Sequence, residues 1–210
     1  MTTAWVAGAS GLVGGELLRL LVADAAFESI VSVGRRTIAV VSSKVTQVTV
    51  DFADEATFAS LDPADVAFSC LGTTIKKAGS KEAFRAVDHD AVLAFAKAAR
   101  SKGAKVLVHV SSLGADRASR AFYASVKGEV EEDLAALGYD SVYALRPSIL
   151  DGDRAESRPL ERVGLAFARA LGPLLGKYRP TEASAVARTM IAKAKAKESG
   201  AHVVDAGAIT

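Results

Sequence analysis

The feature that most constrains the fold of this chain is a short apolar strand that runs into a glycine-rich turn at the start of a helix. The segment WVAGASGLVGGELLRLL has the spacing G-x-x-G-x-x-G at Gly8, Gly11 and Gly14. Such a turn leaves no room for a Cβ atom, and the helix N-terminus presents backbone N–H groups and partial positive charge. The spacing departs from the commonest fingerprint, G-x-G-x-x-G, but strand, loop and helix follow in the order that a dinucleotide pyrophosphate requires. The pattern predicts a nucleotide-binding loop; the alternative is an ordinary turn and helix cap.

Short apolar runs alternate with longer segments of helical period along the rest of the chain, which is typical of parallel strands joined by crossover helices. The run VLVHV is apolar at nearly every position, as expected of a central strand covered on both faces. We therefore predict a doubly wound, mostly parallel α/β sheet of Rossmann type. The predicted strands are 4–7, 30–33, 45–50, 66–70, 106–110, 141–145 and 202–204. The predicted helices are 12–23, 81–102, 118–137, 160–171 and 182–197.

Composition limits the domain count, the compartment and the partners. The 210 residues, 50% of them hydrophobic, are enough for one well-cored domain, so we predict a single domain over 1–210 with a small substrate-side extension at about 151–200. A net charge of +2 predicts no nucleic-acid partner. The lone Cys70 has no partner for an internal disulfide, and MTTAWVAGAS shows no leader pattern, so we expect a cytoplasmic protein. Because every apolar stretch is interrupted within about 18 residues, we expect no membrane association.

The residues after the second predicted strand indicate which dinucleotide is bound. In NAD sites an acidic residue about 20 positions beyond the glycine loop accepts hydrogen bonds from the ribose. Here VSVGRRT places Arg35 and Arg36 at that point, and guanidinium groups pair well with a 2′-phosphate. The pattern favours NADP (as NADPH) over NAD; the alternative is that both arginines are loop surface residues. Asp51, which ends VTVD, is either a contact of the adenine edge or an ordinary exposed strand-end residue.

Candidate catalytic residues lie in FYASVKGEVE and in the serine pair before it. Tyr123 and Lys127 are four residues apart, so they share one face of the predicted helix. We expect the Lys127 ammonium to lower the pKa of the Tyr123 phenol from about 10 toward that of a working proton donor, and to bind ribose hydroxyls. Ser111 and Ser112 follow the VLVHV strand, where ligands bind in open α/β sheets. A serine there polarises a substrate carbonyl or, alternatively, caps a local turn.

The glycine loop, the paired serines, YASVK and LRP together resemble the short-chain dehydrogenase/reductase superfamily. Within it, CLGTT, KAGSKEAFRAVDHD, SSLGAD, VKGEVE and RAESRP resemble the Tat-interactive-protein group of atypical, NADP-binding members, over roughly residues 6–160. The resemblance implies Ser112 as the catalytic hydroxyl. It implies a cofactor site lined by Ser10, Gly11, Leu12, Val13, Arg35, Arg36, Leu71, Gly72, Tyr123, Lys127, Leu150 and Arg158.

Two functions fit these residues. The first is an NADP-dependent oxidoreductase that acts on an unidentified small carbonyl or alcohol; the second is an NADP(H)-binding redox sensor that reports to a protein partner. Only the enzyme needs Ser112, Tyr123 and Lys127 together, which favours catalysis. The three histidines have no partners at metal-ligand spacing, so we expect no metal site. The sequence leaves the substrate and any homo-oligomer open.

Overall fold

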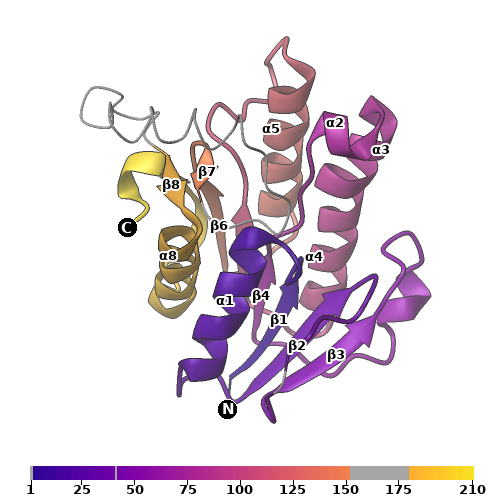
Figure 1. Cartoon of the computed structure of the whole chain (residues 1–210), viewed down its shortest axis with the longest axis vertical. Coiled ribbons are helices and arrows are strands. Elements are labelled where there is room, and N and C mark those ends of the chain that lie inside the picture. Colours follow the sequence, from indigo (N-terminus) through magenta and orange to yellow (C-terminus); the bar gives the residue numbers. More distant parts are fainter. Residues whose placement is uncertain (1, 41, 152–179) are drawn as a thin grey trace.

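A seven-stranded parallel sheet forms the centre of the computed structural model, which describes residues 2–40, 42–151 and 180–210 (Figure 1). The strand order is β3-β2-β1-β4-β5-β6-β9, and every pair of neighbours is parallel. The chain therefore winds outward from β1 in one direction and from β4 in the other, which leaves a crevice at the carboxyl ends of these two strands. The strands are β1 (Thr3–Ala7), β2 (Ser29–Gly34), β3 (Val45–Thr49), β4 (Val66–Ser69), β5 (Val106–Val110), β6 (Ser141–Arg146) and β9 (Gly200–Asp205).

Helices cover both faces of the sheet. On one face α1 (Leu12–Ala23) lies beside α8 (Ala183–Ala196), and their apolar residues share a core with the β1 and β5 side chains of that face. The other face carries α4 (Ala91–Ser101) and α5 (Phe122–Ala135), which pack over a second core. The predicted doubly wound α/β fold is therefore confirmed. The shorter elements are η1 (Glu55–Phe58), α2 (Ile75–Ala78), α3 (Lys81–Arg85), η2 (Ala86–Asp90), β7 (Leu150–Asp151), β8 (Thr181–Glu182) and η4 (Ala206–Ala208).

All seven predicted strands are present, with ends displaced by at most two residues. The predicted helix 81–102 is interrupted, because α3 passes into the π-helical turn η2 before α4 begins. The helix predicted from 118 begins at Phe122, since Asp116 accepts a hydrogen bond from the Ala118 N–H and holds the preceding residues in a turn. The predicted helix 160–171 lies outside the described residues.

The described residues between β2 and β3, 35–40 and 42–44, form no helix, although a doubly wound sheet usually has one there. This part of the connection instead lies over the α1 face, where Ile38 and Val40 pack against the core. The Gln47 side chain fixes it, because its amide accepts a hydrogen bond from the Ile38 N–H at 2.7 Å and donates one to the Ile38 carbonyl at 2.9 Å. This extended connection forms one wall of the cavity described below.

None of the helices in the described part of the chain is both long enough and apolar enough to cross a membrane.

Candidate dinucleotide and catalytic site

The glycine loop between β1 and α1 is packed too closely for side chains. Gly8 has φ +84°, and a Cβ atom there would lie 2.5 Å from the carbonyl oxygen of Cys70 at the end of β4. A Cβ on Gly14 would collide with the Gly8 carbonyl oxygen. Gly11 is exposed, and as the N-cap of α1 it has no capping side chain, nor is there an acidic residue in the first turn. The loop therefore presents helix N–H groups without competition, which suits a pyrophosphate.

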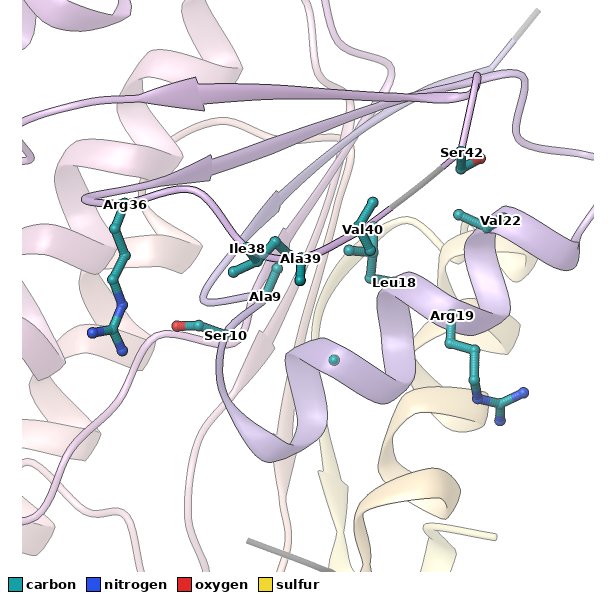
Figure 2. Close-up of a pocket in the computed structure, with 11 residues that line it drawn as sticks. Ala9, Ser10, Leu18, Arg19, Val22, Arg36, Ile38, Ala39, Val40 and Ser42 are labelled. Atoms are coloured by element: carbon teal, nitrogen blue, oxygen red, sulfur yellow. The ribbon is translucent and has the colours of Figure 1, made fainter. Parts of the chain in front are cut away.

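A cavity of about 570 Å³ lies beside this loop, between α1 and the connection 35–44. Ser10 and Arg36 line one part of it, and apolar side chains such as Leu18 and Ile38 line another. Figure 2 shows the Arg36 guanidinium and the Ser10 hydroxyl on the same side, while Arg19 points away from them. Arg36 is exposed and forms no ion pair with any described residue, so its charge is available to a ligand.

Lys127 is buried in the inner face of α5, with only 3% of its surface exposed. Its ammonium lies 2.8 Å from Asp88 Oδ1. Tyr123, one turn earlier on α5, is partly exposed and packs against Phe84, with the ring centroids 5.3 Å apart. The expected pair thus shares one face of a helix at the carboxyl side of the sheet. The structure adds a partner for Lys127 that the sequence analysis did not single out.

That partner, Asp88, is fully buried on the π-helical turn η2. Its second oxygen, Oδ2, accepts a hydrogen bond from the Thr73 N–H at 2.7 Å, so it also holds the loop after β4. Gly72 in this loop is exposed, and a Cβ there would lie 3.4 Å from Asp88 Oδ1 and 3.8 Å from Lys127 Nζ. The run VDHD carried a signal, because a carboxylate at an inward position of a helical pattern calls for a buried partner.

The two serines after β5 have different surroundings. The Ser111 hydroxyl donates a hydrogen bond to Glu131 on α5, whose carboxylate also accepts two from Arg146, at 2.6 and 3.0 Å. Ser112 is partly exposed, and its hydroxyl has no hydrogen-bond partner among the described residues. The Asp116 N–H donates to the Ala124 carbonyl at 3.1 Å, so the loop that carries Ser112 folds onto the first turn of α5.

The other predicted cofactor-binding residues come from several segments of the chain. Leu71 and Gly72 follow β4, and Leu150 lies in β7. Arg158 lies outside the described residues. Leu12 and Val13 form the first turn of α1 beside the glycine loop, and Arg35 is exposed next to Arg36.

Two reactive side chains near the site are held in their neutral forms. Burial raises the pKa of the Cys70 thiol to about 12, so Cys70 is no thiolate nucleophile at neutral pH. Burial, with a smaller contribution from the Lys127 charge, lowers the pKa of His109 well below its ordinary 6.5. In the ranges that the structure describes, no cluster of His, Cys, Asp and Glu could hold a metal ion.

A parallel sheet with a glycine loop at its switch point, and with exposed arginines after the second strand, defines a dinucleotide-binding protein of Rossmann type. Residues 8–165 match the NAD(P)H-binding family, and the chain belongs to this family.

Sequence relatives narrow the group. The chain is 44% identical over 174 residues to the protein of Emericella nidulans named "Protein fmp52, mitochondrial". This alignment covers 79% of this chain and 74% of the relative. It is 38% identical over 171 residues to protein HTATIP2 of Rattus norvegicus, and this alignment covers 80% of this chain and 70% of the relative. The predicted resemblance is confirmed: the chain is an atypical short-chain dehydrogenase/reductase that resembles HTATIP2.

Solved structures support the fold. MoeE5 in complex with UDP-glucose and NAD superimposes with a TM-score of 0.73 at 19% identity, over 96% of this chain and 74% of that one. The Bordetella bronchiseptica enzyme WbmH in complex with NAD⁺ gives a TM-score of 0.72 at 16% identity, over 99% of this chain and 76% of that one. The fold is thus the NAD(P)-binding Rossmann fold.

The expected cytoplasmic location is wrong by comparison with the relatives. The matching proteins from Emericella nidulans, Candida albicans and two Aspergillus species are named mitochondrial. A lone cysteine argues against an oxidising compartment, but it does not distinguish one reducing compartment from another.

Proposed function

We propose that the protein is an NADPH-dependent reductase of small carbonyl compounds, which also runs in reverse as an alcohol dehydrogenase. The observation that carries the proposal is the buried Lys127 ammonium one helical turn from the partly exposed Tyr123. A buried ammonium is costly, and its place one turn from a phenol supports a role in stabilising a phenolate, which is a role that dinucleotide binding alone does not require.

The preference for NADPH rests on Arg36 and Ser10. Both line one part of the cavity beside the glycine loop, and none of the described residues that line this cavity is a carboxylate. A guanidinium and a hydroxyl on the same side suit a 2′-phosphate, whereas a ribose hydroxyl would be better served by an acidic residue. Arg35 is exposed next in the chain and contributes a second positive charge.

The chain's own residues have separate roles in the proposed reaction. Bound NADPH supplies a hydride from C4 of the nicotinamide to the carbonyl carbon. The Tyr123 hydroxyl gives its proton to the carbonyl oxygen, which yields the alcohol. The Ser112 hydroxyl donates a hydrogen bond to the same oxygen, since Ser111 is already bonded to Glu131. Lys127 stabilises the phenolate that Tyr123 becomes and binds ribose hydroxyls.

The test is a panel of small aldehydes and ketones, followed by the loss of NADPH absorbance, with Tyr123→Phe as the variant. Because this change removes one oxygen and keeps the ring, NADPH affinity should survive while turnover falls roughly 10²–10⁴-fold. Tyr139→Phe is the matched control. Its hydroxyl bonds the Ala96 carbonyl at 2.6 Å inside the core, so its loss should lower stability by about 1 kcal/mol and leave turnover unchanged.

Full activity of Tyr123→Phe would contradict the catalytic assignment. Tight NADPH binding without turnover on any carbonyl would favour the alternative, a redox sensor that acts through a protein partner.

A further inference from the structure

Asp88 joins two parts of the site that are far apart in the sequence. One carboxylate oxygen lies 2.8 Å from Lys127 Nζ, and the other accepts the Thr73 N–H at 2.7 Å. The side chains of Asp88 and Lys127 are only 1% and 4% exposed. A buried ion pair is weak evidence for stability, because apolar residues of similar volume often serve as well. A contribution to folding stability is therefore a weak explanation for the Asp88–Lys127 ion pair, and a role in the site is a better one.

The backbone that carries Asp88 is unusual as well. Residues 86–90 form a π-helical turn inside an otherwise α-helical segment. Such turns are rare and occur frequently at functional sites. This one buries two successive polar side chains, Asp88 and His89, and the His89 ring lies 2.9 Å from Asp133 Oδ2 on α5. The turn thus fixes Asp88 against the helix that carries Lys127.

The ion pair lies directly below the exposed Gly72. A Cβ at Gly72 would be in van der Waals contact with both Asp88 Oδ1 and Lys127 Nζ, and any longer side chain would cover them. We propose that Asp88 is a positioning residue, which holds the Lys127 ammonium and the backbone at Gly72 and Thr73 where the nicotinamide end of a dinucleotide contacts them. The inference rests on the proposed function and deepens it.

The other charges around the pair are already compensated. Burial keeps His109, on the strand below, neutral. On α5, Glu129 is paired with Arg85 and Glu131 with Arg146. On the other neighbouring elements, Cys70 is neutral, Arg117 is paired with Glu132 and Asp133, and Asp116 is exposed to solvent. Among the described residues, Asp88 is thus the carboxylate that contacts Lys127.

This arrangement predicts opposite effects of two substitutions on the pH dependence of turnover. Asp88→Asn keeps an acceptor for the Thr73 N–H but removes the negative charge, so the Lys127 ammonium favours the Tyr123 phenolate more strongly. The midpoint of the pH–rate profile should move to lower pH. Lys127→Met removes the positive charge, and the midpoint should move to higher pH. A residue that only supported the fold would lower activity without moving the midpoint.

The experiment combines these profiles with calorimetric NADPH affinities for Asp88→Asn, Lys127→Met and the double variant. We expect each single variant to bind NADPH at least about tenfold more weakly, and the double variant to bind no more weakly than Lys127→Met. Asp62→Asn removes one negative charge at an exposed position with no ion pair in the described structure, and should match the wild type.

An unshifted pH–rate midpoint in Asp88→Asn would overturn the positioning role and leave the proposed function intact. Wild-type NADPH affinity in the double variant would overturn both the positioning role and the ribose contact assigned to Lys127. If the single variants fail to fold because a charge is left buried, the double variant, which buries no net charge, decides through its affinity. If the proposed function is wrong, the wild-type protein itself will show no turnover. The NADPH affinities of the variants then still test whether Asp88 positions Lys127.

Discussion

In the proposed preference for NADPH, Arg36 is the residue on which the discrimination against NADH depends most directly. Its guanidinium lies on the same side of the cavity as Ser10 and has no ion-pair partner in the described ranges, so a 2′-phosphate would not have to displace a carboxylate from it. Arg35 precedes it and is equally exposed. The sequence suggested both arginines because their distance from the glycine loop follows from the length of one helix and one strand.

Replacing Arg35 and Arg36 by alanine should remove most of the preference for NADPH. Charge-assisted hydrogen bonds contribute about 1.5–3 kcal/mol, so NADPH affinity should fall roughly tenfold or more per arginine while NADH affinity stays unchanged. Titration of both cofactors measures the difference. Arg19→Ala is the control: it removes the same charge from a side chain that is paired with Glu16 and points away from Ser10. Equal affinity of the wild type for NADPH and NADH would refute the preference.

The proposed catalytic residues show how much of the candidate site could be predicted from the sequence. Tyr123 and Lys127 could be paired from their spacing alone, because four residues make one helical turn. The different surroundings of Ser111 and Ser112 could be predicted in part. Side chains alternate along a strand, so Ser111 lies on the same face as His109, which is the face covered by α5. The helical pattern of VDHD marks Asp88 as an inward carboxylate, but its pairing with Lys127 could not be predicted, because that contact depends on a π-helical turn held by a helix over 30 residues later in the chain.

At the scale of elements, α5 organises the site. Three inward positions of this helix each fix a different segment: Lys127 contacts Asp88 on η2, Gly128 admits the loop at 116–117, and Glu131 bonds both Ser111 and Arg146. The motif VKGEVE thus forms a helix and also holds together the loops around the candidate site. Strands such as β5 could be predicted with accurate ends because their apolar runs are local signals, whereas this division of contacts depends on tertiary structure.

Gly128→Ala should therefore damage both stability and turnover. A Cβ there would collide with the backbone of Asp116 and Arg117, so the loop that carries Ser112 must move. Forced overpacking costs about 1–3 kcal/mol, and a shift of about 1 Å at a reacting group can lower turnover by up to about 10²-fold. Urea unfolding and turnover measure the two effects. Gly207→Ala, where a Cβ meets nothing within 4 Å, is the matched control. A Gly128→Ala protein with wild-type stability would show that the loop is not held by this contact.

At the scale of the whole molecule, the buried sheet makes stability depend on pH. His109 lies at the centre of β5 and stays neutral in the folded protein, because its pKa is far below 6.5. In the unfolded chain it takes up a proton near its ordinary pKa of 6.5. Between these two pKa values only the unfolded state binds the proton, so a falling pH favours unfolding.

We expect the free energy of unfolding to decline below about pH 6.5, with this group contributing a slope of up to about 1.4 kcal/mol per pH unit. His109→Leu should flatten that part of the curve. The comparison is made by urea unfolding from pH 8 to pH 5, and the values at pH 8, where His109 is neutral in both states, serve as the reference. An unchanged slope in His109→Leu would show that other groups cause the decline.

The ion pair between Lys127 and Asp88 also bears on the order in which the working protein is assembled. Because the chain carries its own counter-charge for the buried ammonium, the folded protein leaves no charge uncompensated at this point when the cofactor is absent. A newly made chain can therefore complete its core before it meets a dinucleotide. Dinucleotide binding is then a separate step from folding, and the empty protein needs no bound ligand to balance the charge of Lys127.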